Sequence, residues 1–477
     1  MKNNQCASIH FFLLISLVLS IPVVLLNIQY FDDIARTAVG YFGWDRDGRP
    51  LVDLIYKSIS IGDKITDLYP IPQISSYLLL GYGCFLISSK FNLNGLYGIA
   101  LTLPILCSPM LLGNTLFRYD SITMALSMFL CIIPFVISIE NKLLNYITSI
   151  ILVGASLCLY QAALAVYIVL SITVCVISLI NTKNIAISLQ SLIKNAVITV
   201  CGYLLYISII KMFFVMSPAA IKRSALISFN AEGLHSFINS SKLSISILFD
   251  GYGHVLLFIS AIIIVLSLMN FNMRTIGSAR QKLVISAICV ILMLTAFFFT
   301  FALVALTKIP ATVPRSYMAF GFFIFGINAF IFSAGLKKSS FILSLAISTI
   351  MISLNAQALS AVKVIDATQG DISKRVAYTL KENGKNLKDI IVVGKIKTPL
   401  KADEIFKSTP YVKGIIWMHL DNQFASYLVT LNGYPIGLPK KDTIKIVMTK
   451  KDSWNKLDSN SDYSLYTYNT HAILQFN

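Results

Sequence analysis

Charged residues are scarce in this chain. Asp, Glu, Lys and Arg make up 13% of its 477 residues, whereas hydrophobic residues make up 56%. Because soluble domains carry about 25% charged residues, the chain has about half the charge that a fully wetted surface needs. The acids are also unevenly placed, since eleven of the 22 lie after residue 359. The composition excludes a single soluble globular domain and indicates a membrane region followed by a polar tail.

Cysteine and histidine are few, and their positions exclude two kinds of site. No CxxC occurs, the tail has no cysteine, and the five histidines have no metal-ligand spacing, so neither a disulfide framework nor a zinc site is expected. The net charge of +17 comes from scattered Lys and Arg with no stripe interleaved with aromatic residues, which argues against nucleic acid as a partner. The eight cysteines, all in or beside apolar runs, are Cys6, Cys84, Cys107, Cys131, Cys158, Cys175, Cys201 and Cys289.

Long apolar runs fill the first three quarters of the chain. A helix needs about 20 apolar residues to cross a bilayer. Eleven runs meet this need, and the predicted fold class is an α-helical polytopic membrane protein. The first run is longer than a cleaved signal peptide and lacks a small-residue cleavage site, so we expect it to be retained. The predicted spans are 11–30, 74–89, 96–112, 121–139, 145–160, 162–180, 196–216, 253–270, 283–306, 317–335 and 341–358.

Loop charge predicts the orientation of these spans. With the N terminus in the cytoplasm, the inside loops are short and rich in Lys and Arg, and Glu140 is their only acid. The outside loops hold a similar number of basic residues over about twice the length. The positive-inside rule therefore favours a cytoplasmic N terminus, and an odd number of spans places the C terminus outside.

Three segments outside the spans are long enough to carry function. They are the loops 31–73 and 217–252 and the tail 360–477, which separates from a membrane domain at 1–359. Apolar residues at helical spacing after Pro50 predict a surface helix in the first loop, and a second surface helix is expected in 217–252. The tail reads as a small α/β domain. Its predicted helices are 372–383 and 401–408, and its predicted strands are 388–396, 412–420, 443–448 and 464–476.

An acidic pair, Asp32-Asp33, follows the first span directly. Two adjacent carboxylates at a water–lipid boundary repel each other, and partial burial raises the pKa of at least one of them. Such a group can take a proton from a sugar hydroxyl. In the alternative interpretation, the pair only ends the span and caps a helix.

Arginines and aromatic residues occupy the other short outside loops. FRYDS, residues 117–121, contains Arg118 and Asp120, and VPRSY, residues 313–317, contains Arg315. In such short loops the charged side chains lie close to the membrane, where a charge is costly unless it is paired with an opposite charge or has a role in function. A local Arg118–Asp120 pair and a snorkelling Arg315 are the structural alternatives. Together, the carboxylates and arginines on one face suit a lipid-phosphate substrate, which needs a base for the acceptor and cations for the phosphate.

A family resemblance rests on these motifs as a set. The loop opening with Asp32-Asp33, followed by FRYDSITMAL, LCLYQAAL and VPRSYMAF, resembles the serotype-converting, O-antigen-modifying glucosyltransferases of the Gtr type. The resemblance covers about the first 360 residues. It implies a GT-C-like architecture in the bacterial inner membrane with the tail in the periplasm. It also implies transfer of glucose from undecaprenyl-phosphate-glucose to a lipid-linked O-antigen acceptor, within a setting of membrane lipids.

The resemblance also implies roles for individual residues. Asp32 and Asp33 match the acidic pair of GT-C enzymes, in which one carboxylate is the base and the other orients the acceptor or holds a cation. The cofactor expectation is none, with a divalent cation such as Mg²⁺ or Mn²⁺ left open. We expect phosphate contacts from Arg118 and Arg315, then Lys222 and Arg223. Residues expected at the substrate are Tyr119, Asp120, Tyr160 and Gln161.

Two other classes of protein share a many-span pattern. A flippase for lipid-linked sugars would need polar groups inside its spans, where this chain has almost none besides Lys211. An O-antigen polymerase usually has its large periplasmic loop in mid-chain, whereas the soluble residues of this chain gather at its C terminus. Another polyprenyl-dependent glycosyltransferase stays an alternative.

Overall fold

The structure is a computed structural model that describes residues 2–60, 62–93, 95–250, 261–270, 279–383 and 386–477. Its internal contacts divide the chain into two units. The first unit is Met1–Leu25, Gly43–Ile59 and Leu68–Ala356, and the second is Leu26–Phe42, Ser60–Asp67 and Gln357–Asn477. The outside loop predicted at 31–73 is therefore shared between the units, and its acidic pair belongs to the unit that contains the tail.

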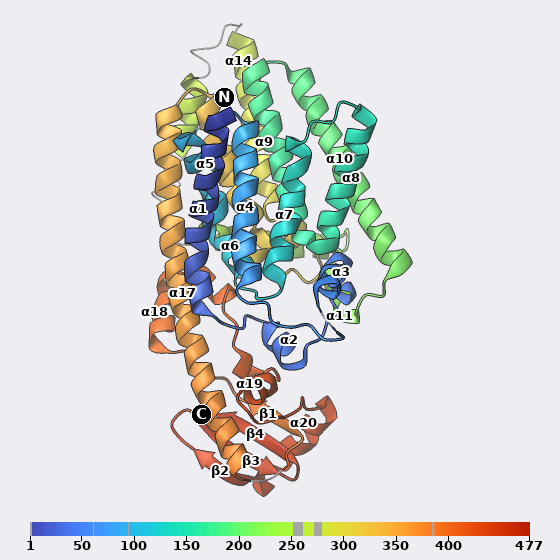
Figure 1. Cartoon of the computed structure of the whole chain (residues 1–477), viewed down its shortest axis with the longest axis vertical. Helices are drawn as coiled ribbons and strands as arrows, with labels where there is room; N and C mark the ends of the chain where they lie inside the picture. Colours follow the sequence, from blue (N-terminus) through green and yellow to red (C-terminus); the bar gives the residue numbers. More distant parts are fainter. Residues whose placement is uncertain (1, 61, 94, 251–260, 271–278, 384–385) are drawn as a thin grey trace. The chain divides into compact units, whose positions relative to one another are not determined.

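The first unit is a bundle of apolar helices (Figure 1). Most of these helices are apolar around their whole circumference, which is typical of segments surrounded by lipid and by one another. The Gln161–Ala163 turn joins two helices with almost no loop, as the sequence indicated. The helices are α1 (Lys2–Leu26), α4 (Ile71–Lys90), α5 (Leu96–Cys107), α6 (Pro109–Thr115), α7 (Asp120–Val136), α8 (Lys142–Leu159), α9 (Leu164–Thr182), α10 (Ile185–Phe213), α14 (Ala279–Phe299), α15 (Ala302–Ala305), α16 (Ala319–Ser333) and the beginning of α17 (Lys337–Glu382).

Eight described helices are long and apolar enough to cross a membrane, or nine if the bent pair α5–α6 is one span. Two shorter apolar helices, α7 and Ala261–Asn270, coincide with further predicted spans. The second of these helices belongs to the span predicted at 253–270, and residues 253–260 of that span lie outside the described residues. A mostly helical membrane fold is therefore confirmed, and the total of eleven spans stays a prediction.

Small residues let neighbouring helices of this unit approach closely. A Cβ added at Gly81 of α4 would lie 2.0 Å from the Ser16 Oγ of α1. A Cβ at Gly202 of α10 would lie 2.7 Å from a methyl group of Val153 of α8. Close backbone approach increases van der Waals contact, which is a main source of helix association in a bilayer.

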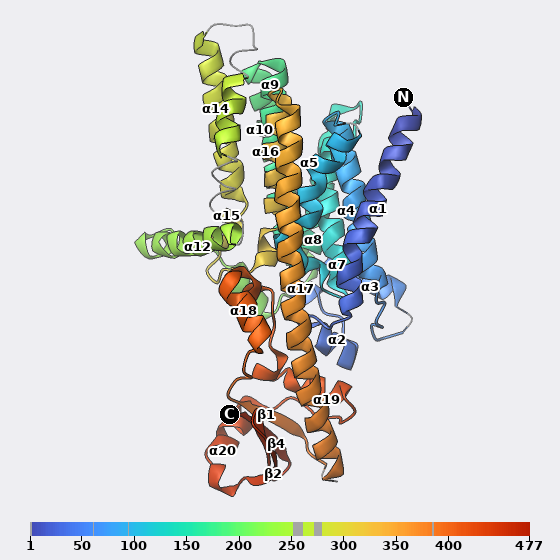
Figure 2. The ribbon, with the colours of Figure 1, turned by 90° about the vertical axis from the view of Figure 1, so that its left-hand side faces the viewer.

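The loops of the first unit contain further helices. The surface helix predicted after Pro50 is α3 (Pro50–Ile59), and the segment 217–252 contains α11 (Pro218–Ser224) and α12 (Ala231–Phe249). Short 3-10 turns lie at Asp45–Asp47 (η1) and Pro314–Tyr317 (η3). Figure 2 shows α12 lying across the direction of α14. The predicted helices in both loops are thus confirmed.

The second unit contains a four-stranded sheet in the order β1-β4-β3-β2. Strands β3 and β4 form an antiparallel hairpin, and β1 pairs with β4 in parallel. The end of α17 packs on one face of the sheet, where Val376 and Leu380 meet Ile390 and Leu474. Val447 of α20 packs on the other face. The elements are α2 (Asp33–Val39), β1 (Asp389–Val393), α18 (Leu400–Ser408), α19 (Ala425–Leu431), α20 (Lys441–Met448), β2 (Asn455–Ser459), β3 (Tyr463–Tyr468) and β4 (His471–Phe476).

Two predicted strands of the tail were wrong. The segment 412–420 contains parts of two 3-10 turns, Pro410–Gly414 (η4) and His419–Asp421 (η5), with irregular chain between them. The segment 443–448 belongs to helix α20. A short apolar run does not distinguish a strand from a helix, because one buried face needs only two or three apolar residues in either. In α20 Val447 alone is fully buried, a pattern that one helical turn satisfies.

Candidate active site

The acidic pair opens helix α2 of the second unit. Asp33 is fully buried, and its Oδ2 accepts a hydrogen bond of 3.2 Å from the backbone N–H of Tyr30. The side chain of Asp32 is 28% exposed and lies 3.4 Å from the guanidinium of Arg36, one turn along the helix. The two carboxylates therefore differ: that of Asp33 organises the turn, and that of Asp32 reaches the surface of the unit.

The residue before the pair has a backbone conformation that needs support. Phe31 has a φ of +54°, in the left-handed region that is unfavourable for an aromatic side chain. The ring of Phe31 packs edge-on against Trp417, with 4.2 Å between the ring centroids. Its carbonyl oxygen lies 2.8 Å from Nε2 of His419. Tyr30 adds a hydrogen bond from its hydroxyl to the carbonyl of Ile415. Residues 415–419 of the tail thus hold the turn that carries Asp32 and Asp33.

Burial lowers the pKa of His419 to about 4, although the Phe31 carbonyl and the nearby charge of Asp32 act in the opposite direction. At neutral pH the imidazole is therefore uncharged. Because a carbonyl only accepts, the contact assigns the proton of the neutral ring to Nε2, which donates to Phe31. The support of the turn then depends on a neutral histidine.

Acid should loosen this turn. A folded-state pKa of about 4, below the ordinary 6.5, means that the stabilisation is complete above pH 6.5 and is lost as the pH falls towards 4. The difference corresponds to roughly 3 kcal/mol. In the full-length protein in detergent, the protection of amides around Phe31 against hydrogen exchange, expressed relative to the intrinsic rate at each pH, should fall between pH 7 and pH 5. His419→Gln keeps a donor and should remove that pH dependence, whereas equal dependence in both proteins would contradict this assignment.

A second cluster lies in the first unit, around Asp120. Its Oδ1 accepts hydrogen bonds from Trp44 Nε1 at 2.7 Å and from the Arg49 guanidinium at 3.2 Å. Asp120 is buried, and Arg49 lies over the ring of Tyr160 at 4.7 Å. Trp44 in turn stacks on Tyr56, so the carboxylate fixes residues of the loop 43–59 to the start of α7.

Further contacts hold the same loop. Gln161 Nε2 donates to the carbonyl of Gly48 at 2.8 Å and to the hydroxyl of Tyr206 at 3.0 Å. The Tyr206 hydroxyl donates to the same carbonyl at 3.1 Å. Gly48 has a φ of +75°, and a Cβ there would lie 2.7 Å from that hydroxyl, so only glycine fits. Asp120, Tyr160 and Gln161, which are expected at the substrate, thus also contact this loop.

Acids within the loop have structural partners of their own. Asp53 accepts hydrogen bonds from the backbone amides of Gly43, Trp44 and Asp45. Burial acts to raise the pKa of Asp53, but these bonds and one from the Asp45 side chain outweigh it and lower the pKa below its ordinary value. Burial and the neighbouring Asp53 raise the pKa of Asp45. Asp45 and Asp53 thus have structural contacts within the loop 31–73.

The two main candidate phosphate ligands each lie over an aromatic ring of the first unit. The Arg118 guanidinium is over the ring of Tyr69 at 4.6 Å, and that of Arg315 is over the ring of Phe117 at 5.6 Å. Helix α6 and the η3 turn, which carries Arg315, are in contact. The structure therefore brings Arg315 beside the chain neighbour of Arg118, although the two positions are 197 residues apart in the sequence.

The weaker cationic candidates are on the surface of the same unit. Arg223 is 57% exposed and pairs with Asp47 at 2.7 Å, and Lys222 beside it is exposed. Tyr119 is buried, and its backbone carbonyl accepts a hydrogen bond from the Tyr56 hydroxyl. None of these contacts gathers Lys222, Arg223 or Tyr119 with Arg118 and Arg315.

The acidic pair is a poor donor set for a divalent cation. Mg²⁺ and Ca²⁺ need several oxygen ligands in open geometry, whereas Asp32 is paired with Arg36 and Asp33 is buried in a turn. Within the described ranges, no group of three or more His, Cys, Asp or Glu side chains is arranged to hold a metal. We therefore derive no step through a metal ion.

Comparison with known proteins settles the family. The family model described as glucosyl transferase GtrII matches residues 21–355, which is well over half of the chain. The chain belongs to the GtrII glucosyl transferase family. The match includes Asp32, Asp33, Arg118 and Arg315 and ends one residue before the first unit does. The resemblance inferred from the sequence motifs is thus confirmed.

A relative of this GtrII chain is an uncharacterized 55.3 kDa protein in the gtrB 5′ region of Salmonella phage P22. The two are 30% identical over 263 residues, which is 54% of this chain and 53% of the relative. The chain thus matches about half the length of that protein. No solved structure matches the chain significantly.

Sequence patterns missed several residues of these clusters. Arg49 and Trp44 lie 71 and 76 residues before Asp120 in the sequence, so their contact with it becomes visible only in the fold. His419 and Trp417 lie beyond the GtrII match, in a segment that was predicted to be a strand. The only sequence signal was that His419 lies in an apolar run, and a histidine in such a run more often has a packing role than a chemical one.

Proposed function

We propose that this GtrII chain is a membrane glycosyltransferase that moves a glucosyl group from undecaprenyl-phosphate-glucose to a sugar of the lipid-linked O-antigen repeat. The observation that carries the proposal is the GtrII match over residues 21–355, which includes both the acidic pair and the two arginines. The proposed setting is the periplasmic face of a bacterial inner membrane, where the product would alter the serotype. The Asp32 carboxylate, partly exposed beside Arg36, supports the presence of a base.

The proposed reaction is a displacement at the anomeric carbon of glucose. Asp32 takes the proton from an acceptor hydroxyl as the hydroxyl oxygen forms a bond with that carbon. The bond between the anomeric carbon and the phosphate oxygen breaks, and its electron pair leaves with undecaprenyl phosphate. Arg118 and Arg315 neutralise the growing charge on the phosphate. Asp33 is a positioning residue, because it is buried and fixes the turn through Tyr30.

Replacing the arginines by lysine tests their role as phosphate ligands. A guanidinium binds phosphate through two parallel hydrogen bonds, whereas an ammonium acts as a point charge. Arg118→Lys and Arg315→Lys should each reduce turnover by about tenfold or more, the effect of losing roughly 1.4 kcal/mol of transition-state stabilisation. The amount of inserted protein should stay normal. Arg280→Lys, at an exposed position near the start of α14, is the matched control and should have little effect. Full turnover in both Arg118→Lys and Arg315→Lys would remove the two arginines from the donor site.

We also propose the topology that this mechanism needs. The N terminus is cytoplasmic, eleven spans follow, and the domain from residue 360 lies in the periplasm. The support is the density of Lys and Arg in the short inside loops. A reporter fused after Asn477 should be active only outside the cytoplasm. Activity confined to the cytoplasm would overturn the topology and the proposed side of the reaction.

The direct test is transfer by the purified protein. Proteoliposomes containing the full chain should move labelled glucose from undecaprenyl-phosphate-glucose to a lipid-linked O-antigen acceptor. Accumulation of the unreacted donor on the opposite leaflet would instead favour a flippase. Joining of two repeats without incorporation of label would favour a polymerase.

A further inference from the structure

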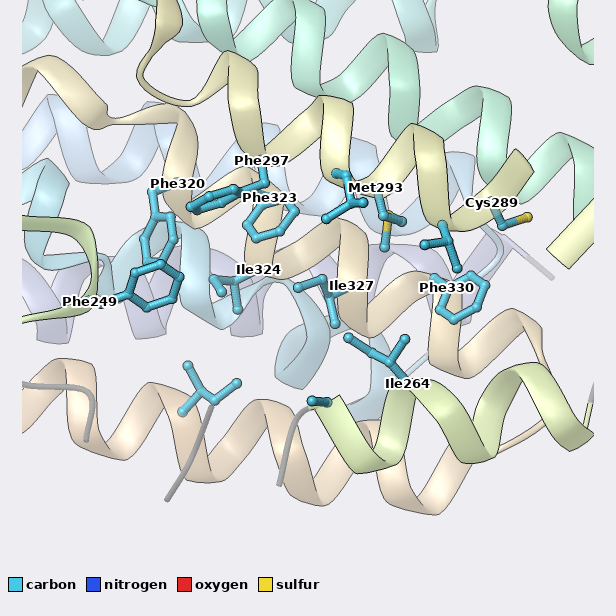
Figure 3. A pocket seen from close by; sticks show the side chains of 14 residues that line it. Phe249, Ile264, Cys289, Met293, Phe297, Phe320, Phe323, Ile324, Ile327 and Phe330 are labelled. Atoms are coloured by element: carbon cyan, nitrogen blue, oxygen red, sulfur yellow. The ribbon is translucent and has the colours of Figure 1, made fainter. Parts of the chain in front are cut away.

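An apolar cavity of about 450 Å³ lies inside the first unit. Its walls come from α14, α16 and the helix Ala261–Asn270, with single contributions from the end of α12 and from α17. Figure 3 shows phenylalanine and isoleucine side chains pointing into this space, and no described lining residue carries a charge. We call this space the α16 cavity.

The α16 cavity is named for the helix along which it runs, whose lining residues extend from Phe320 to Phe330. Ten residues of helix correspond to about 15 Å. In Figure 3, Phe249 and Phe320 lie at one end of the cavity, and Cys289 and Phe330 lie at the other. Its shape is thus that of a slot parallel to a membrane helix, with room for part of an extended hydrocarbon chain.

The η3 turn, which carries Arg315, directly precedes α16, and the lining residue Phe320 lies in the first turn of that helix. In the same turn, the hydroxyl of Tyr317 is hydrogen-bonded at 2.7 Å to that of Ser244 in α12, the helix that ends at the lining residue Phe249. A half-buried cation five residues before Phe320, which lies at one end of an apolar slot, is complementary to an amphipathic anion, such as a phosphate joined to a hydrocarbon chain. Neither a soluble sugar nor a charged peptide matches this combination.

We propose that the α16 cavity binds the first isoprene units of the donor lipid, with the phosphate beyond its Phe320 end, towards Arg315. This inference rests on the proposed lipid-phosphate donor. Bulk lipid surrounds the protein on all sides, so burial of a chain in the cavity gains little from the hydrophobic effect. Selection must come from packing, and the five phenylalanines of the wall offer rigid surfaces against a branched, unsaturated chain.

Met293→Trp tests the proposal by narrowing the cavity. The full-length variant should have a KM for undecaprenyl-phosphate-glucose raised at least tenfold. Its KM for a donor with a two-isoprene tail, which reaches only the entrance, should change less than threefold. Ile291→Trp is the matched control, because Ile291 is 61% exposed on the same helix, two residues away. It should leave both KM values unchanged. Ile327→Trp, from the opposite wall, serves if Met293→Trp does not insert.

Native mass spectrometry of the purified wild-type protein separates the possible lipids. A retained polyprenyl phosphate that is lost in the narrowed variant would support the proposal. Retained phospholipid in its place, or equal changes in KM for the long and short donors, would overturn it. If the wild-type protein uses neither glucosyl lipid phosphate, the proposed function itself fails, and the two failures are thereby distinguished.

Discussion

Asp32→Asn should lower the rate of glucosyl transfer by about 10²- to 10⁴-fold, the usual effect of losing a general base. Asp32 is the partly exposed carboxylate of the pair, and the amide removes its basicity with little change in shape. The measurement is turnover of the purified, lipid-reconstituted protein with undecaprenyl-phosphate-glucose. Membrane insertion and protein amount should equal those of the wild type.

Asp33→Asn is the matched control for that experiment. Its side-chain carbonyl can still accept the hydrogen bond from Tyr30, so the turn should persist and the loss of rate should be much smaller. Asp33→Ala removes the acceptor and should reduce activity together with stability. Near-normal transfer in Asp32→Asn and Asp33→Asn would mean that the pair is structural and that the mechanism is wrong. An equal, large loss of rate in both variants would show that transfer needs both carboxylates and would contradict the assignment of the base to Asp32 alone.

Asp120→Ala should lower the free energy of unfolding of the first unit by about 3 kcal/mol, at the lower end of the effect of breaking a buried ion pair. The lower end applies because Arg49 is 23% exposed and regains some water. The substitution also removes the acceptor of Trp44 Nε1. Thermal unfolding in detergent, followed by tryptophan fluorescence, measures the change.

Asp47→Ala provides the comparison for Asp120→Ala. It removes an ion pair of the same loop in which both side chains are exposed, and such pairs contribute about 0–1 kcal/mol. Its unfolding should therefore be close to that of the wild type. Equal stability of both variants and the wild type would show that Asp120 does not anchor the loop. Asp120 would then return to consideration as a substrate ligand.

Local sequence information was sufficient for the helical part of this fold. Apolar runs of about 20 residues have few alternatives to a membrane helix, and the described helices coincide with the predicted spans. The tail was harder to predict, because its elements are short. The hairpin β3–β4 was visible from alternation, whereas α20 depends on packing of Val447 against a sheet face that the sequence does not specify.

The candidate site was partly predictable for a related reason. Asp32, Asp33, Arg118 and Arg315 stand out because they lie directly beside long apolar runs in a chain with only 13% charged residues. Their partners do not stand out, since the tail residues that hold the turn at Phe31 are almost 390 residues away in the sequence. Asp120 stands out in the sequence as well, but its contact with Arg49 requires the loop to fold back over 71 residues.

Mass spectrometry of the O-antigen from a bacterial host with and without this chain tests the central claim most directly. The host needs a repeat without a glucose branch and the enzyme that makes undecaprenyl-phosphate-glucose. The account predicts one additional hexose on the repeat when the wild-type chain is present, and none with Asp32→Asn at equal protein amount. An unmodified repeat with abundant, inserted wild-type protein would contradict it.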